Sequence, residues 1–373
     1  MPGLRSIALT AVVLTFGQEP EVRLGNPTGI IAEPYSDLFG LAELPDGRVI
    51  VADRVLKEFS VADFRAGSRQ VLGRNGPGPN EYQSAFGVIR WRGDTLLGYD
   101  ATGTRLVRFT PAGTMAGSHA MALPGEAGGV GPPRSVDRAG NLYWDTPRVD
   151  RVAMKRMLKA RILRWMPGQE RPEVVAEFTD HTEDDHHLRY RAMPRTDAWA
   201  VTQDGRVAIL SATEYRLRWL RDGRVVDSGP PIPFNQVPVT AAERDAFREQ
   251  KSLEGGGGAS IGVGPGASAP RMSLERVKAA WPDSLFPRTM PPFEAHAMLL
   301  SPNGDFYVGR TGAASESVRR VDVLDESGRR RATIRLPEHS RLVGLGVRAI
   351  YVLRFDDDGL QTLQRFAYPI LTR

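Results

Sequence analysis

The residues most able to bind a metal ion lie together in one acidic, histidine-containing segment. Its candidate ligands are Asp180, His181, Asp184 and His186. Carboxylate oxygens and imidazole nitrogens suit zinc or another divalent ion. Spacing within a loop does not fix a coordination geometry, and no His-Glu-x-x-His frame is present, so a solvated polar loop is the alternative interpretation.

Other common catalytic motifs are missing from the sequence. The chain contains no Cys, which excludes disulfides, thiolate catalysis and Cys-type zinc sites. The Gly-rich residues 125–131 and 255–266 lack the Lys-Ser/Thr pair of a phosphate-binding loop, and no Gly-x-Ser-x-Gly elbow occurs. Residues 356–359, Asp-Asp-Asp-Gly, lack the alternation of an EF-hand loop and fit a hairpin turn.

The composition is that of a soluble globular chain. Of the 373 residues, 41% are hydrophobic and 25% are charged, with a net charge of +5. Only five of the 49 basic residues are Lys, and the Arg residues are spread along the chain near carboxylates, so we predict no nucleic-acid partner. The 39 Gly and 28 Pro residues indicate many turns, and hence many short strands.

The first residues have the order of a secretory signal. Arg5 precedes an uncharged apolar run of eleven residues, which ends at Phe16 and is followed by Gly17. This run is too short to cross a bilayer, which needs about 20 residues. We expect residues 1–17 to be a signal peptide and the protein to be exported to the periplasm or extracellular space, without membrane insertion after cleavage. A buried N-terminal strand is the alternative.

The rest of the chain repeats a hairpin unit. Each copy has an apolar strand, a tight Asp-Gly type turn, a β-branched or aromatic strand and then a strand that ends in an aromatic residue. The turn residues Gly47, Gly93 and Gly140 are 46 and 47 residues apart, and the longer intervals to Gly205 and Gly304 indicate insertions. A period near 45 residues with four strands per unit is typical of a β-propeller blade.

Six such units predict an all-β, six-bladed β-propeller of four-stranded antiparallel blades over residues 18–373. The sixth unit stops after its third strand. We expect the N-terminal strand at residues 21–24 (Glu-Val-Arg-Leu) to complete the last blade, because ring closure removes an exposed sheet edge. A β-sandwich of irregular hairpins is the alternative.

Residues 238–292 depart from the repeat and predict a helical, Gly-rich insertion between blades four and five. Thr240 and Glu243 have the spacing of a capping box that opens a helix over residues 241–253. Ser273 is placed to cap a second, shorter helix. The helical pair packs on the rim of the ring or forms a lid over one mouth of its channel.

On these repeats the chain resembles the six-bladed propellers of the NHL-repeat-like and TolB-like kind, which occur in exported bacterial proteins. Residues 73–82 (Gly-Arg-Asn-Gly-Pro-Gly-Pro-Asn-Glu-Tyr) are similar to the Gly-Arg-x-Gly-x-Gly-Pro-x-Glu-aromatic linker between the first two blades of many such proteins. The resemblance covers about residues 20–370. It implies the fold and export, and it implies no particular activity.

Three residues of this fold are candidate ligand contacts. Arg74 and Glu81 in the linker either form a structural ion pair or point into the channel toward a ligand. His296 is the only histidine on a strand predicted to be innermost, so it either faces the channel or is a core residue.

Three functions remain open from the sequence. The favoured one is a monomeric, non-catalytic scaffold that needs no cofactor and binds a protein, peptide or glycan at a channel mouth. A calcium-dependent lactonase or esterase, like the gluconolactonase and paraoxonase propellers, is the alternative. Its possible calcium ligands would be Glu33, Glu81, Asp100, Asn235 and Glu294. The third is a purely structural module.

Overall fold

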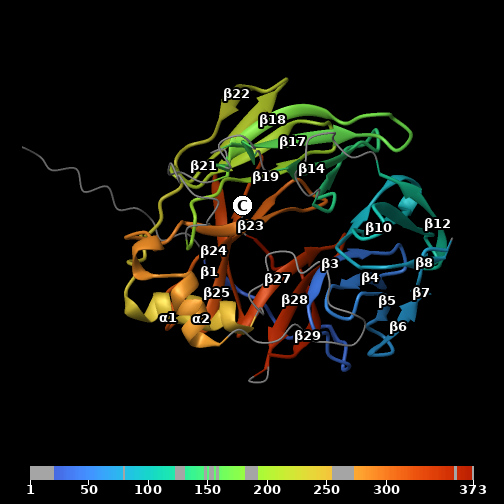
Figure 1. The fold of residues 1–373 in the computed structure, drawn as a ribbon, viewed down its shortest axis with the longest axis horizontal. Helices are drawn as coiled ribbons and strands as arrows, with labels where there is room; N and C mark the ends of the chain where they lie inside the picture. Colours follow the sequence, from blue (N-terminus) through green and yellow to red (C-terminus); the bar gives the residue numbers. More distant parts are fainter. Residues whose placement is uncertain are drawn as a thin grey trace, which may run out of the picture.

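The computed structural model shows a ring of antiparallel sheets arranged around an axis (Figure 1). It describes residues 21–78, 80–121, 131–146, 149–150, 155–156, 159–180, 192–253, 273–356 and 359–371. Within these residues six four-stranded blades are present, one of which carries a fifth strand. The predicted six-bladed propeller is therefore confirmed.

The first three blades follow the predicted repeat. Blade one consists of β3 (Leu38–Glu43), β4 (Val49–Asp53), β5 (Glu58–Asp63) and β6 (Ser68–Leu72). Blade two consists of β9 (Val88–Arg90), β10 (Leu96–Asp100), β11 (Arg105–Phe109) and β12 (Met115–Ala120). Blade three consists of β13 (Ser135–Val136), β14 (Leu142–Thr146), β17 (Lys159–Trp165) and β18 (Glu173–Thr179).

The other three blades complete the ring. Blade four consists of β19 (Ala198–Val201), β20 (Val207–Ser211), β21 (Arg216–Arg221) and β22 (Arg224–Ser228). Blade five consists of β23 (Phe293–Leu300), β24 (Phe306–Arg310), β25 (Val318–Leu324) and β26 (Arg330–Glu338). Blade six consists of β27 (Ser340–Leu345), β28 (Ala349–Phe355), β29 (Gln361–Ala367) and β2 (Gly29–Ile30).

Short elements lie in the connections between these strands. They are β7 (Arg74–Asn75), β8 (Glu81–Tyr82), β15 (Val149–Asp150), β16 (Lys155–Arg156) and the 3₁₀ turns η1 (Arg92–Asp94) and η2 (Asp283–Leu285). The turn between the first two strands of a blade needs a residue with positive φ. Gly47, Gly140, Gly205 and Gly304 supply it, with φ values of 88°, 82°, 82° and 91°.

The N-terminal segment closes the ring, but through a different strand from the predicted one. Blade six is completed by β2, which pairs antiparallel with β29. Residues 21–24, to which we assigned this role, instead supply β1 (Glu21–Arg23), a fifth strand parallel to β26 at the edge of blade five. There the Glu21 carboxylate lies 3.0 Å from Arg320 and 3.7 Å from Arg335. The assignment of residues 21–24 to the last blade is wrong.

The short strand β2 fits against blade one through a close contact between Gly29 and Phe64. A Cβ atom added to Gly29 would lie only 2.8 Å from the Cβ of Phe64 in blade one. The backbone of β2 can therefore approach blade one only because this position is glycine. Hydrogen bonds from Thr28 and Ile31 to the carbonyls of β29 continue the pairing on both sides of β2.

The hydrophobic core is divided among the six interfaces between neighbouring blades. Each cluster of buried apolar side chains combines residues of two consecutive blades. Between blades one and two, for example, the rings of Phe59 and Phe109 lie 5.3 Å apart. Between blades six and one, Phe64 lies 5.7 Å from Tyr351, so the interface at the junction of the termini is packed like the others.

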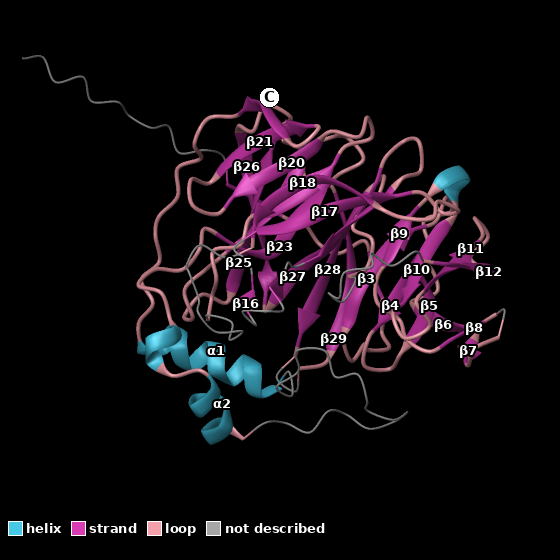
Figure 2. Cartoon of the chain, turned by 45° about the horizontal axis from the view of Figure 1, so that its top comes forward, coloured by secondary structure: helices cyan, strands magenta, loops and turns pink. Residues whose placement is uncertain are grey.

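The insertion between blades four and five contains the two predicted helices, α1 (Ala241–Leu253) and α2 (Leu274–Ala280). Thr240 and Glu243 form the capping box, in which the backbone N–H of Thr240 donates to the Glu243 carboxylate at 3.0 Å. Figures 1 and 2 show both helices beside blade five, at the rim of the ring rather than across its centre. No helix of the described residues is long and apolar enough to cross a membrane.

The strand order gives the ring two different faces. In each blade the innermost strand begins at one face, and the loop between the second and third strands returns to that same face. We call this the loop face. The connections between consecutive blades reach the innermost strands there, so the linker of residues 73–87 and the helical insertion both belong to it. Longer loops on a rigid scaffold commonly carry function.

Candidate ligand site at the loop face

The linker between blades one and two contains the predicted ion pair. β7 and β8 run parallel, with Arg74 opposite Glu81. The Nε atom of Arg74 lies 2.6 Å from one Glu81 oxygen, and the other oxygen accepts a hydrogen bond from the Gly78 N–H at 2.9 Å. The Gly78 N–H and the Arg74 guanidinium lower the pKa of Glu81.

A second, buried ion pair anchors the same linker. Asp100, which has no exposed surface, lies 3.0 Å from the Nε atom of Arg105. Arg105 also donates to the carbonyl oxygens of Gly76, Pro77 and Glu81, at 3.1, 3.0 and 2.8 Å. One guanidinium therefore satisfies backbone acceptors that a loop without regular pairing would otherwise leave unbonded.

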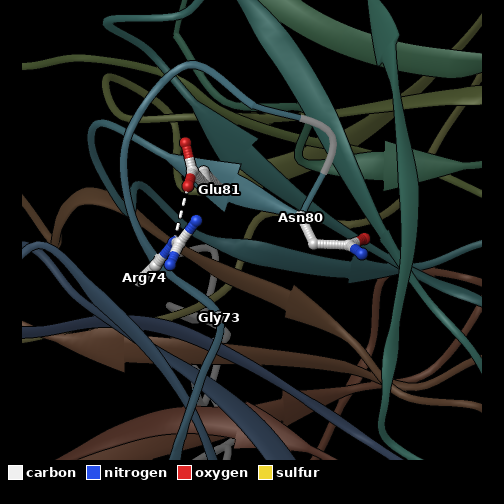
Figure 3. A pocket seen from close by; sticks show the side chains of 4 residues that line it. All are labelled: Gly73, Arg74, Asn80 and Glu81. Carbon is white, nitrogen blue, oxygen red and sulfur yellow. Dashed lines mark hydrogen bonds and ion pairs between the residues drawn. The ribbon is translucent and has the colours of Figure 1, made fainter.

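An open pocket of about 480 Å³ lies against the Arg74–Glu81 pair and is also lined by Gly73 and Asn80. Figure 3 shows Arg74 and Glu81 pointing toward each other, with Asn80 directed away from them. The Arg74 side chain is 82% exposed. β7 and β8, which carry the pair, lie at the outer edge of the ring in Figure 1. The pair braces the linker, and ligand contact at these residues stays a prediction.

His296 is displayed by a wide bulge in the innermost strand of blade five. β23 and β24 pair at Phe293 with Arg310 and again at Met298 with Val308, so residues 294–297 stand opposite a single residue of β24. Within this bulge His296 has a left-handed backbone, with φ of 63°, and an exposed side chain. Bulges and strained residues are concentrated at functional sites because they redirect side chains.

The side chain that meets His296 comes from blade three. The Nη1 atom of Arg134 lies 2.6 Å from His296 Nδ1, and its Nη2 atom lies 3.4 Å from the His296 carbonyl oxygen. Arg134 also lies 3.3 Å from Asp145 on β14, and its guanidinium carbon lies 5.2 Å from the ring centre of Trp199 on β19. We call Arg134, Asp145, Trp199 and His296 the mouth cluster. It joins blades three, four and five.

Two members of the mouth cluster occupy positions that other blades use for packing. When the blades are compared by their strand pairing, the positions equivalent to Arg134 in blades one, two, four and five hold the apolar residues Leu41, Val88, Trp199 and Met298. The positions equivalent to Asp145 in the same four blades hold Ala52, Tyr99, Leu210 and Gly309. A charged pair at two apolar positions of a repeat indicates a role other than blade packing.

The contact with Arg134 fixes the tautomer of His296. A guanidinium carries only donors and keeps its charge in proteins. His296 Nδ1 must therefore accept the hydrogen bond from Arg134, and the proton of the neutral ring lies on Nε2. Asp145 balances the charge of Arg134, so the cluster can present N–H donors to a ligand oxygen without accumulating net positive charge.

Apolar side chains lie on the same face in blade one. Phe39 on β3 is 44% exposed, and the turn residues Val55 and Leu56 are 47% and 41% exposed. The Phe39 ring packs edge-on against Phe86 at 5.8 Å and beneath the Arg54 guanidinium at 5.1 Å. Because β3 is flanked by β9 and β27, an exposed side chain on it faces the axis or the loop face. We call Phe39, Val55 and Leu56 the apolar lip.

Most of the predicted metal ligands fall outside the described residues. Asp180 directly follows β18, and its carbonyl oxygen accepts a hydrogen bond from Thr196. His181, Asp184 and His186 lie outside the described residues, so the metal site stays a prediction. In the part of the chain that the structure describes, no group of three or more His, Asp or Glu side chains could hold a metal ion.

The acidic residues considered for a calcium site are engaged in ion pairs or exposed in the structure. Glu33, Glu81 and Asp100 each have a guanidinium partner of their own, and Asn235 and Glu294 are exposed. The partners of the first three are Arg69, Arg74 and Arg105. These contacts give the lactonase interpretation no structural support.

Sequence reasoning identified His296 but missed Arg134 and Asp145. His296 was found because it is the only histidine on an innermost strand. Arg134 and Asp145 are two of many charged residues near short strands, so nothing in their types marks them out. An alignment of the blades at their turn residues would have shown both as charged residues at apolar repeat positions.

No protein-family model and no curated protein sequence matches the chain. Among solved structures it is similar to a member of the DUF4221 family from Bacteroides vulgatus, with 9% identity over 92% of this chain and 95% of that one and a TM-score of 0.49. It is also similar to the calcium-binding protein regucalcin from Agrobacterium tumefaciens, with 12% identity, coverage of 94% and 98%, and a TM-score of 0.43. Virginiamycin B lyase from Staphylococcus aureus shows 8% identity, coverage of 92% and 99%, and a TM-score of 0.45. These values carry no inference about function.

Proposed function

We propose that the protein is an exported binding scaffold that holds a protein, peptide or glycan at the loop-face end of the propeller axis. The mouth cluster carries this proposal. It brings a guanidinium of blade three and an imidazole of blade five into contact at 2.6 Å, and two of its members, Arg134 and Asp145, occupy positions that other blades fill mainly with apolar residues. The apolar run that follows Arg5 supports export.

The backbone of His296 strengthens the functional interpretation. A non-glycine residue held at positive φ costs of order 1–3 kcal/mol, and such residues are retained mainly where the strain serves a function. The bulge that creates this conformation interrupts the β23–β24 ladder at the end of the strand nearest the loop face. A strand that served only to pack blade five would gain stability from regular pairing.

The proposal is tested with the purified protein in two screens, a glycan array and a displayed library of random peptides. We expect one screen to yield ligands whose affinity falls at least tenfold for Arg134→Gln. Arg224→Gln, an exposed Arg on the outer strand β22, is the matched control and should bind normally. Thermal melting establishes that both variants are folded. Ligands that bind Arg134→Gln as tightly as the unchanged protein, or no ligand in either screen, would contradict the proposal.

A further inference from the structure

We infer that the ligand at the loop face is a peptide segment in which a carboxylate lies next to an apolar side chain. The inference rests on the proposed function and names the chemical class of its ligand. The carboxylate would bind at the mouth cluster, and the apolar side chain would pack on the apolar lip.

The donors of the mouth cluster favour a carboxylate. Arg134 has five N–H groups, and its hydrogen bonds within the described residues use Nη1 twice and Nη2 once. The Nε–H and one Nη2–H, which form one edge of the guanidinium, have no acceptor among those residues. This edge matches the two oxygens of a carboxylate in a bidentate pair.

The apolar lip and the mouth cluster belong to the same face of the ring. The innermost strands β3, β9 and β13 are consecutive neighbours around the axis. Phe39 on β3 contacts Phe86, which directly precedes Gly87 at the start of the next blade. A Cβ atom added to Gly87 would lie 3.4 Å from Pro132, two residues before Arg134. Contacts between neighbouring blades therefore connect Phe39 to the segment that leads into Arg134.

The chemistry of this surface favours a peptide over a glycan. Sugar rings stack on flat aromatic faces, whereas two of the three lip residues, Val55 and Leu56, are aliphatic. The indole of Trp199 is buried, with 1% of its surface exposed, and cannot supply a stacking face. Aliphatic side chains beside a charged anchor instead match the alternation of apolar and acidic residues in a peptide.

The test selects peptides of random sequence, with free C-termini, on the full chain. Selected peptides are resynthesised with each carboxylate converted to its amide, and their affinity is measured by fluorescence polarisation. We expect one amide to weaken binding at least tenfold. The same amide should cause little further loss of affinity for Arg134→Gln, because that variant already lacks the contact between the guanidinium and the peptide carboxylate. Phe39→Ala should also weaken binding, whereas the exposed Val225→Ala on β22 should not.

The outcomes separate this inference from the proposed function. Peptides that need Arg134 but lose nothing on amidation would overturn the carboxylate inference and leave the binding site in place. If no peptide is selected and a glycan binds with an affinity that depends on Arg134, the peptide inference is likewise overturned and the binding site is kept. Ligands that are insensitive to both Arg134→Gln and Phe39→Ala would overturn the inference and the proposed function together.

Discussion

At the scale of single residues, His296 combines backbone strain with a fixed hydrogen bond. Its φ of 63° lies in the region that glycine adopts without cost, and its ring nitrogen accepts from Arg134. The first feature lowers stability and the second directs the Nε2 proton. These two effects can be separated by substitution.

We expect His296→Gly to be more stable than His296→Ala by about 1 kcal/mol, because glycine has no Cβ to oppose a left-handed backbone. Urea denaturation of both variants measures the difference. The neighbouring Ala297, which lies in the same bulge without positive φ, is the control. Ala297→Gly should lower the free energy of unfolding. If glycine proves less stable than alanine at position 296, the backbone is not strained there.

The tautomer of His296 can be observed directly. Long-range ¹H–¹⁵N correlation spectra of the imidazole distinguish a protonated from an unprotonated ring nitrogen. We expect Nε2 to carry the proton at neutral pH, because Arg134 can only donate to Nδ1. In Arg134→Leu the constraint disappears, and both tautomers should be populated. A proton on Nδ1 in the unchanged protein would contradict the contact.

The buried Asp100–Arg105 pair makes a prediction about stability. Asp100→Ala would leave the Arg105 guanidinium without its buried carboxylate, which typically costs roughly 3–5 kcal/mol. The exposed pair of Arg218 and Glu214 is the control, and Glu214→Ala should change stability by less than about 1 kcal/mol. Denaturant midpoints and slopes of the two variants test the contrast. Equal losses would show that the linker does not depend on Arg105.

At the scale of elements, the repeated hairpins were predictable and the ring closure was not. Third strands such as Leu106-Val107-Arg108-Phe109 place an Arg and a ring on opposite faces, and the structure buries the ring of Phe109 completely. β2 has only two residues, so it shows no alternation, and its position depends on the close approach of Gly29 to Phe64. β1 has a more strand-like sequence and was therefore assigned in its place.

The two N-terminal strands should differ in importance. A chain that begins at Gly25 lacks β1 but keeps β2 and the packed interface between blades six and one, so we expect it to fold with a modest loss in melting temperature. A chain that begins at Ala32 lacks both strands and Ile31, which is fully buried in that interface. It should unfold with a broad transition or aggregate through the exposed edge of β29. Thermal melting followed by circular dichroism compares the two. Similar behaviour of both truncations would show that β2 does not close the ring.

At the scale of the whole molecule, the basic residues are almost entirely Arg. Arg keeps its charge to about pH 12 and above, whereas Lys loses its charge near pH 10.4. With only five Lys among 49 basic residues, the ion pairs that brace the blades and linkers should persist in alkaline solution. Any loss of stability between pH 10 and 12 must then come mainly from titratable groups other than the basic side chains.

Buried tyrosines are those groups. Burial raises the pKa of Tyr35, Tyr82, Tyr99 and Tyr307 to about 12, against about 10 in an unfolded chain. Below pH 10 both states keep the phenol proton. Between pH 10 and 12 the unfolded state releases the proton first, so stability falls by at most about 1.4 kcal/mol per pH unit for each such tyrosine.

We therefore expect the free energy of unfolding to be nearly constant from pH 8 to about pH 10 and to fall steeply above it. Urea denaturation at a series of pH values gives the free energy, and tyrosinate absorbance near 295 nm follows ionisation in the same samples. Much of the tyrosinate signal should appear together with the loss of circular dichroism, because the buried rings ionise only as the blade interfaces open. Complete ionisation near pH 10 with the fold intact would show that solvent reaches these rings and that the interfaces between blades are not closed.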